Sequence, residues 1–268
     1  MKSPRSYLFV PGHRPDRFEK AAASGADAII LDLEDAVGQD LKSAARDNVV
    51  NWFANGRQGI VRINGEDSPW FEDDLAALGE TQCRTVMVPK ATPDSLSKVS
   101  SLLPGTELIA LVESAEGLAM LRTSVLITGV TRLAFGNLDF GADTRIPGSG
   151  SVLDFARFEI VLASRLGKLL QPVDGVTTDL KDTAVIASDI NRVRALGFGA
   201  KLCIHPAQVG PVNSGFAPTE AEVDWAHRIL EALDAAAGSV VQLDGKMIDR
   251  PLIDRAKQIL QDADTTAP

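Results

Sequence analysis

Short apolar runs alternate with longer amphipathic segments along most of the chain. Eight of the runs are short and rich in aliphatic and β-branched residues, which is typical of strands. Most show little alternation of apolar and polar positions, as expected for parallel strands covered on both faces. The expected strands are residues 6–11, 27–34, 59–64, 85–90, 107–113, 132–136, 174–179 and 200–206.

The segments between these runs carry helix signals. Residues 14–25 end at Gly25, a suitable C-cap, and Thr92 precedes Pro93 as an N-cap before a first-turn proline. Residues 151–169 and 182–197 are longer and strongly periodic. Strands that each lead into a helix or loop crossover predict the α/β class and a (β/α)8 TIM barrel. An open doubly wound sheet is the alternative, but no GxGxxG motif follows the first run.

The last fifty residues depart from this alternation. Residues 219–238 form an amphipathic segment with Thr219 and Glu222 in capping-box spacing, followed by a short run and a final helical segment. This region is too small for a second core. We therefore predict a barrel over residues 1–218 and a C-terminal helical extension over residues 219–268, an arm that packs on the barrel or on a neighbouring subunit.

Composition narrows the class of protein and its partners. The chain has 268 residues, 45% hydrophobic and 24% charged, which suits a single barrel of about 250 residues. A net charge of −9 disfavours nucleic acid and anionic membranes as partners, so an anionic substrate would need a local basic patch. No apolar stretch approaches the roughly 18 residues of a membrane span, and the first residues lack a signal-peptide core. Cys83 and Cys203 fit no zinc spacing, so we expect buried thiols and a cytoplasmic protein.

Charged residues end seven consecutive expected strands. In a barrel the carboxyl ends of the strands build the catalytic face. Charged side chains are almost never buried unless they are paired or bind a ligand, so this repetition predicts a functional site. The residues concerned are Glu34 and Asp35, Arg62, Lys90, Glu113, Asp139, Asp179 and Asp182, and His205.

Glu113 and Asp139 end adjacent strands and should lie side by side at the barrel mouth. Two carboxylates that close raise each other's pKa unless a cation lies between them, and oxygen ligands with open positions suit Mg²⁺. The alternative is that Glu113 caps the following helix and that Asp139 is a turn residue.

The basic candidates have alternatives too. Arg62 either pairs with Glu34 or binds a substrate carboxylate through its bidentate fork, and Lys90 either forms a salt bridge or contacts the substrate. His205 reads as a hydrogen-bonded histidine at a strand end rather than a ligand. Since the other histidines lack metal-like spacing, zinc is not expected.

Eight motifs in sequence order, between about residue 5 and residue 257, resemble the citrate lyase β-subunit family. Its relatives include the malyl-CoA, citramalyl-CoA and β-methylmalyl-CoA lyases. Each motif alone is weak, but their order along nearly the whole chain is specific. The motifs are SYLFVPGHRPDRFEKA, DAIILDLEDAV, VRIN, VMVPKA, LIALVESAEGL, AFGNLDFGAD, GFGAKLCIHPAQV and DGKMIDRPLI.

The resemblance implies a TIM barrel that binds Mg²⁺ through Glu113 and Asp139. Arg62 matches the arginine that grips the carboxylate of the oxo acid. Glu34 and Asp35 match acidic residues that hold metal-bound water and orient that arginine. The resemblance therefore gives this set its expected catalytic roles.

The resemblance also implies contacts with the rest of the substrate. Asp249 matches an aspartate that reaches into the site of a neighbouring subunit, and the family is typically trimeric, so we expect a homotrimer or a multiple of it. Gly136 and Asn137 are expected to line the pocket, with Lys90 as a further substrate contact. The expected contacts to coenzyme A are Phe9, Pro11, Arg14 and Lys20.

The function implied is a Mg²⁺-dependent lyase that cleaves or forms a carboxylated 3-hydroxyacyl-CoA, such as malyl-, methylmalyl- or citramalyl-CoA. The products of cleavage are a 2-oxo acid and an acyl-CoA, with Asp249 as general base. One alternative is the β subunit of a citrate lyase complex, which acts on citryl-acyl carrier protein. A second is a CoA-independent 2-oxo-acid aldolase. A third is a ligand-binding relative without activity, which the intact Glu113, Asp139, Arg62 and Asp249 disfavour.

Overall fold

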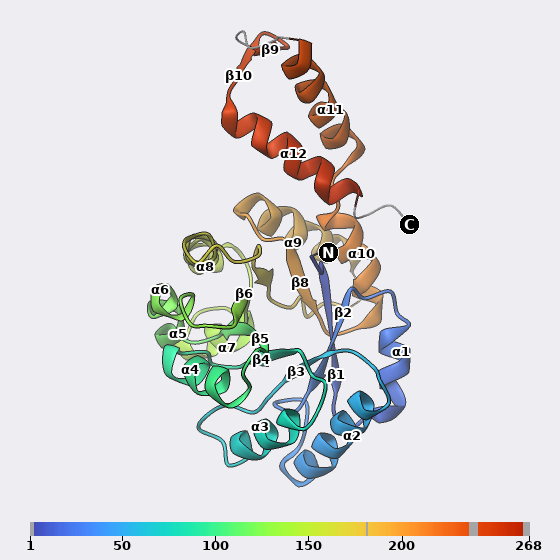
Figure 1. Cartoon of the computed structure of the whole chain (residues 1–268), viewed down its shortest axis with the longest axis vertical. Helices are drawn as coiled ribbons and strands as arrows, with labels where there is room; N and C mark the ends of the chain where they lie inside the picture. The colour runs from blue at the N-terminus through green and yellow to red at the C-terminus, as the bar shows by residue number, and fades with distance from the viewer. Residues whose placement is uncertain (1–2, 181, 236–240, 265–268) are drawn as a thin grey trace. The chain divides into compact units, whose positions relative to one another are not determined.

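The computed structural model describes residues 3–180, 182–235 and 241–264 (Figure 1). The chain divides into two compact units. One comprises residues 4–215, and the other comprises Ser3 and the described residues from Phe216 onward.

The larger unit is a closed barrel of eight parallel strands in the order β1 to β8, with β8 paired back to β1. The prediction of a (β/α)8 barrel is therefore confirmed. Helices follow the strands and surround the barrel (Figure 1). The strands are β1 (Ser6–Pro11), β2 (Ala28–Asp32), β3 (Ile60–Arg62), β4 (Thr85–Val88), β5 (Glu107–Val112), β6 (Val130–Phe135), β7 (Val173–Asp174) and β8 (Ala200–Cys203).

The helices of this unit begin close to the predicted signals. Thr92 forms the expected N-cap: its Oγ1 accepts a hydrogen bond from the backbone N–H of Ser95 at 3.2 Å. The helices are η1 (Pro15–Arg17), α1 (Phe18–Ala22), η2 (Gln39–Leu41), α2 (Lys42–Ala54), α3 (Phe71–Gly79), α4 (Pro93–Leu102), α5 (Ala115–Ala119), α6 (Leu121–Ser124), α7 (Asn137–Thr144), η3 (Ser151–Leu153), α8 (Asp154–Leu166), α9 (Thr183–Leu196), η4 (Pro206–Gln208) and α10 (Val209–Phe216).

A continuous apolar cluster fills the barrel and draws side chains from all eight strands. These positions are buried because each strand presents alternate residues to the interior, where they pack in layers. The packed interior leaves the strand ends and the loops beyond them as the place for a site. The cluster consists of Tyr7, Ile30, Ile60, Met87, Ile109, Leu111, Ala134, Val173, Ala200 and Leu202.

The seventh strand is shorter than predicted. It spans two residues instead of the expected 174–179, because the chain beyond Asp174 is held by side chains rather than by a strand ladder. Asp179 and Asp182 therefore do not end a strand. Both are exposed, and Asp182 caps α9 by accepting a hydrogen bond from the N–H of Ala184 at 2.8 Å.

The two cysteines are free thiols. Cys203 is buried as predicted, whereas Cys83 is only half-buried. Burial raises the pKa of Cys83 to about 11 and that of Cys203 to about 12, so both groups are protonated thiols at neutral pH.

The smaller unit pairs two helices, α11 (Glu220–Ala235) and α12 (Arg250–Asp264), with a hairpin of β9 (Val241–Leu243) and β10 (Lys246–Ile248). The predicted capping box is present: Glu222 N–H donates to Thr219 Oγ1 at 3.2 Å, and Thr219 N–H donates to Glu222 Oε2 at 2.9 Å. Of the predicted helix 219–238, residues 236–238 lie outside the described part of the chain. No helix among the described residues is long and apolar enough to span a membrane.

Candidate active site

Arg62 is held by two acidic residues of the neighbouring strand and its loop. β2 and β3 pair in parallel with Asp32 opposite Arg62, so the two residues lie side by side at the carboxyl ends of their strands. Arg62 Nε donates to Asp32 Oδ1 and Nη2 donates to Oδ2, both at 2.7 Å. Nη1 lies 2.9 Å from Glu34 Oε2. The bidentate pair fixes the plane of the guanidinium at the carboxyl end of β3.

The surroundings of Arg62 keep it charged. Its guanidinium carbon lies 4.8 Å from the centre of the Phe9 ring, and Asp35 lies 3.8 Å from Nη1. Burial alone would lower the pKa of Arg62, but the charge and hydrogen bonds of Asp32, with the charge of Glu34, raise it. Arg62 is therefore a fixed cation, and the predicted pairing with Glu34 is present. Its contact with a substrate carboxylate stays a prediction.

Glu113 follows β5 directly and is buried. Its Oε1 accepts a hydrogen bond from the backbone N–H of Lys90 at 2.7 Å. Its Oε2 lies so close to Gly136 that a Cβ there would be 2.6 Å away, so only glycine fits at this position. The pKa of Glu113 is raised to about 7, chiefly by burial; the Lys90 N–H and the charge of Arg62 oppose the rise, and the charge of Asp139 adds to it.

Glu34 is the second buried carboxyl group at the barrel mouth. Its pKa is raised to about 8, chiefly by burial; the charge of Arg62 opposes the rise, and the charges of Glu113, Asp35 and Asp32 add to it. The charges of Glu34, Glu113 and Asp35 act on one another, so these side chains share one site.

The acidic groups are suited to a divalent cation. Glu34 and Glu113 are each destabilised as anions by burial and by neighbouring carboxylates, and Arg62 offsets this only in part. Buried Glu34 Oε2 has its ion pair with Arg62 Nη1 at 2.9 Å but accepts no hydrogen bond of good geometry. Within the described ranges no three His, Cys, Asp or Glu side chains converge as a metal cluster. The charge of Asp139 acts on Glu113, so these two carboxylates are the candidate oxygen ligands, and they would leave other positions for water or substrate, as Mg²⁺ prefers.

Other predicted residues of the barrel have different environments. Lys90 contacts Glu113 through its backbone N–H, not through its side chain. The residue is exposed and has a φ of 44°. Asp139 lies exposed in the first turn of α7. Asn137 is buried and its amide binds backbone groups. His205 is exposed and caps η4, as expected for a strand-end histidine.

The expected coenzyme A contacts other than Phe9 lie beside or beyond the end of β1. Pro11 is its last residue and is half-buried, and Lys20 is exposed on α1. Arg14 Nη2 forms an ion pair with Asp16 at 2.8 Å. Asp249 belongs to the smaller unit, where its Oδ1 accepts a hydrogen bond from Leu252 N–H at 3.4 Å at the start of α12. The roles of these residues stay predictions.

Two buried residues of the site were missed in the sequence. Asp32 is the bidentate partner of Arg62, and the signal was available as the acid that ends the apolar run AIILD. Lys42 fixes the loop after β2: its Nζ donates to the carbonyls of Leu33 and Glu34, both at 2.7 Å. No signal in the sequence pointed to this role of Lys42, because a lysine in a helical segment is ordinary.

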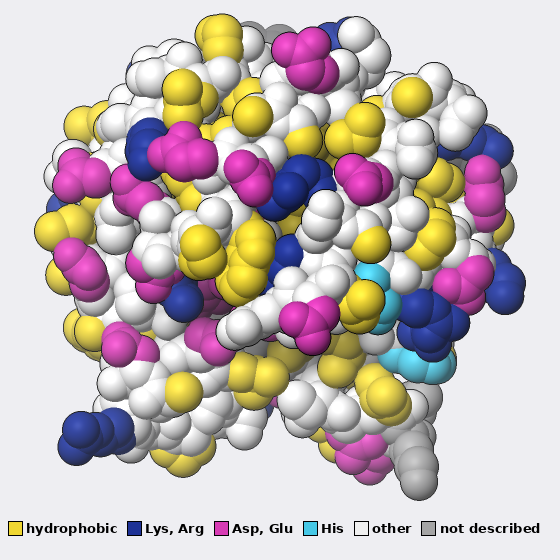
Figure 2. Space-filling model, turned by 90° about the horizontal axis from the view of Figure 1, so that it is seen from below, with side chains coloured by type: hydrophobic (Ala, Val, Ile, Leu, Met, Phe, Trp, Pro, Cys, Tyr) yellow, Lys and Arg dark blue, Asp and Glu magenta, His cyan; other side chains and the backbone are white. Residues whose placement is uncertain are grey.

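Figure 2 shows one face of the molecule, seen from below the view of Figure 1, with Lys and Arg side chains near its middle and Asp and Glu side chains around them. The chain, with its net charge of −9, therefore carries local positive charge on this face. A fixed arginine and buried carboxyl groups beyond the strand ends of a closed barrel define a candidate active site, because the carboxyl ends of the strands carry the catalytic residues of α/β-barrel enzymes.

Comparisons with known proteins define the family. The model of the HpcH/HpaI aldolase/citrate lyase family matches residues 5–206. A (3S)-malyl-CoA thioesterase of Cereibacter sphaeroides is 33% identical, covering 98% of this chain and 95% of the relative. The citrate lyase subunit beta of Escherichia coli is 34% identical, covering 97% of this chain and 93% of the relative.

A solved structure agrees with these matches. The protein CitE from Mycobacterium tuberculosis, in complex with magnesium, acetoacetate and coenzyme A, aligns with a TM-score of 0.85, 30% identity and 98% coverage of both chains. The chain belongs to the HpcH/HpaI aldolase/citrate lyase family. The predicted enzyme class, a lyase, is thereby confirmed at the level of the family, and magnesium is confirmed as a ligand of a solved relative.

Asp32→Asn tests whether the fixed arginine matters. The substitution removes the charge that orients Arg62 and turns one of its two acceptors into a donor. We expect kcat/KM to fall about 10²-fold, the cost of a reacting group displaced by about 1 Å. Steady-state kinetics on the ester that the enzyme cleaves would measure it, with exposed Asp94→Asn as the matched control. Equal kcat/KM for both variants would remove Asp32 from the site.

The raised pKa values predict a pH dependence of stability in EDTA. A folded-state pKa of about 7 for Glu113 means that the native protein binds more protons than the unfolded chain between about pH 4.5 and 7, so the unfolding free energy falls as pH rises. Glu113→Gln removes this titration. Urea unfolding from pH 5 to 8 should show wild type losing up to about 3 kcal/mol relative to the variant. A constant difference across this range would contradict the raised pKa.

Proposed function

We propose that the protein is a Mg²⁺-dependent carbon–carbon lyase for a carboxylated 3-hydroxyacyl-CoA, such as malyl-, methylmalyl- or citramalyl-CoA. The observation that carries the proposal is the group formed by Arg62, held by Asp32, and buried Glu113 with its raised pKa. This group pairs a carboxylate-binding cation with a metal-binding carboxyl. The malyl-CoA relative and the coenzyme A complex of CitE support a CoA ester as substrate.

The residues of the barrel bind and orient the substrate. Arg62 would hold the substrate carboxylate, because its guanidinium is fixed and charged at the strand ends. Glu113 and Asp139 would hold the cation, with Glu34 and Asp35 accepting hydrogen bonds from its water. When bound, Mg²⁺ supplies Lewis-acid stabilisation of the oxygen that becomes the carbonyl of the 2-oxo acid.

Asp249 of a neighbouring subunit would accept the proton of the substrate hydroxyl group. Breaking the carbon–carbon bond then leaves the electron pair on the acyl-CoA carbon as an enolate, which takes up one proton to give the acyl-CoA and so balances the proton that Asp249 accepted. The hydroxyl carbon becomes the carbonyl of the 2-oxo acid. Phe9, Pro11, Arg14 and Lys20 would contact the coenzyme A moiety, with Lys90, Gly136 and Asn137 near the pocket.

Thioester hydrolysis is a second candidate, favoured by the relative named as a (3S)-malyl-CoA thioesterase. It would yield the free acid and coenzyme A instead of a 2-oxo acid and an acyl-CoA. The similarity to a citrate lyase β subunit favours a third candidate, in which the thioester is carried by an acyl carrier protein. The products distinguish the lyase from the thioesterase, and the carrier of the thioester, coenzyme A or an acyl carrier protein, distinguishes the citrate lyase subunit from both.

Turnover of malyl-, citramalyl- and methylmalyl-CoA, with Mg²⁺ or with EDTA, tests the proposal. We expect Mg²⁺-dependent release of one 2-oxo acid and one acyl-CoA from one of the esters. Free coenzyme A with no oxo acid would identify a thioesterase. Activity on citryl-acyl carrier protein alone would identify a citrate lyase subunit. Equal turnover in EDTA would contradict the metal-dependent mechanism.

Asp249→Asn tests the general base. We expect the cleavage rate to fall by about 10²–10⁴-fold while the Kd of the ester is retained, because the amide cannot accept the proton. Asp254→Asn, at an exposed position of α12 five residues further along the chain, is the matched control. Mixing Asp249→Asn with Glu113→Ala subunits should restore part of the activity, because mixed oligomers contain sites with both residues intact. Unchanged turnover of Asp249→Asn, or no recovery on mixing, would reject a base supplied by a neighbouring subunit.

A further inference from the structure

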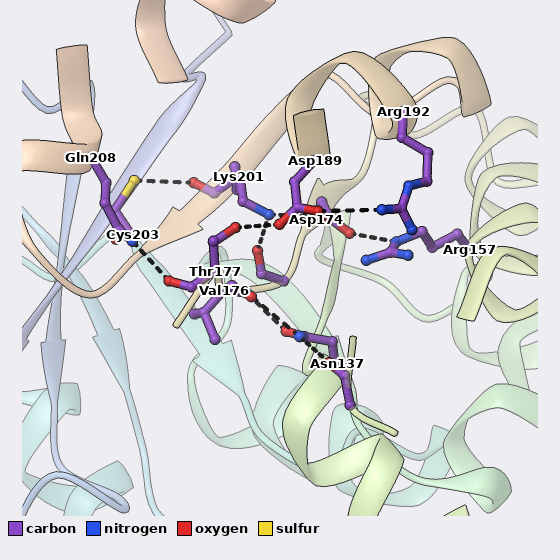
Figure 3. A network of polar contacts seen from close by, with 12 residues as sticks. Asn137, Arg157, Asp174, Val176, Thr177, Asp189, Arg192, Lys201, Cys203 and Gln208 are labelled. Carbon is purple, nitrogen blue, oxygen red and sulfur yellow. Dashed lines mark hydrogen bonds and ion pairs between the residues drawn. The ribbon is translucent and has the colours of Figure 1, made fainter. Parts of the chain in front are cut away.

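The segment that follows β7 is bound to the start of α7 by one side chain. β7 has a single register pair with β6, Ala134 opposite Val173, so a strand ladder does little to close the barrel there. Beyond it, Val176 N–H donates to Asn137 Oδ1 at 2.8 Å, and Asn137 Nδ2 donates to Val176 O at 3.2 Å (Figure 3). The amide of Asn137 therefore replaces the peptide group of a neighbouring strand.

Residues 174–177, the β7 strip, are also held from the other side. Asp174 is buried between Lys201 and Arg157, with oxygen–nitrogen distances of 2.7 and 2.8 Å. Lys201 Nζ also donates to Gly175 O at 2.8 Å, and Gln208 Nε2 donates to Thr177 O at 2.8 Å (Figure 3). The β7 strip is thus a fixed surface against which Asn137 is clamped.

The amide of Asn137 has no hydrogen left for a ligand. The residue is 3% exposed, and its second N–H donates to Gly148 O at 2.6 Å. The fit is close: a Cβ on Gly175 would lie 1.9 Å from Asn137 Oδ1. Asn137 therefore binds the chain itself, on both the β7 strip and the loop after α7.

Asn137 is well placed to set the direction of α7. It is the first residue of this eight-residue helix, and Asp139 follows two residues later in the first turn. The loop that carries Gly148 folds back onto the helix, since a Cβ on Gly148 would lie 3.1 Å from Leu138 Cα. On the other side, Gly136 meets Glu113. The start of α7 is thus fixed beside Glu113 and two residues before Asp139, the two carboxylates of the proposed metal site.

We propose that Asn137 is a positioning residue for Asp139, and that clamping α7 to the β7 strip sets the affinity of the site for Mg²⁺. This inference rests on the proposed Mg²⁺ site. Residues that orient metal ligands typically change metal affinity by about 10- to 100-fold when they are replaced. Loss of the clamp would leave both carboxylates present but would separate Asp139 from Glu113.

Isothermal titration with Mg²⁺ tests the inference on wild type, Asn137→Ala and two reference variants. Asn213→Ala is the matched control, because Asn213 likewise donates from its amide to a distant carbonyl, Gly25 O at 2.9 Å. Glu113→Gln is the reference for loss of a ligand. We expect the Kd of Asn137→Ala to rise about 10- to 100-fold, with kcat recovered at saturating Mg²⁺. The Kd of Asn213→Ala should equal that of wild type.

Asn137→Asp, of equal size, provides a second variant in case the alanine variant does not fold. It keeps the acceptor for Val176 N–H but places an oxygen against Val176 O and Gly148 O, so we expect the same rise in Kd. If a folded Asn137 variant binds Mg²⁺ with the wild-type Kd while Glu113→Gln has lost binding, the role of Asn137 is rejected and the proposed metal site is retained. A kcat that stays low at saturating Mg²⁺ with unchanged Kd would overturn it in favour of substrate contact. Wild-type Kd for Glu113→Gln would overturn the proposed metal site itself.

Discussion

The buried pair of Arg62 and Asp32 is the interaction on which the rest of the site depends. A guanidinium without partners would be costly to bury, but its two hydrogen bonds of 2.7 Å to a carboxylate of the adjacent strand offset that cost. The parallel register of β2 and β3 places the two residues opposite each other, so the barrel itself makes the pair. Glu34 and Phe9 then take positions around a cation whose plane is already fixed.

Acidic groups around this cation exceed what it can offset. Glu34 and Glu113 have pKa values raised to about 8 and about 7, mainly by burial. A divalent cation would convert this unfavourable charge into a binding site, which links the electrostatics of the barrel mouth to the proposed metal-dependent chemistry. Buried polar side chains, Lys42 after β2 and Asn137 after β6, hold the loops on which these groups depend.

The order of apolar runs was enough to predict the barrel, because parallel strands are apolar throughout and helices carry their own caps. The end of β7 could not be predicted, because side chains of Asn137 and Lys201 replace the ladder there. Strand-end charges located the mouth, but the sequence could not tell which acid of LDLED faces Arg62. Nor could it show that Lys90, whose φ is 44°, meets Glu113 through its backbone N–H rather than through its side chain.

The central claim is that Glu113 and Asp139 together hold the catalytic cation. Anomalous X-ray diffraction from crystals soaked in Mn²⁺, a scattering substitute for Mg²⁺, tests it most directly. The account predicts one strong anomalous peak at coordination distance, about 2.1 Å, from a carboxylate oxygen of each residue. A Mn²⁺ ion located elsewhere, or one coordinated by only one of the two carboxylates, would contradict this claim.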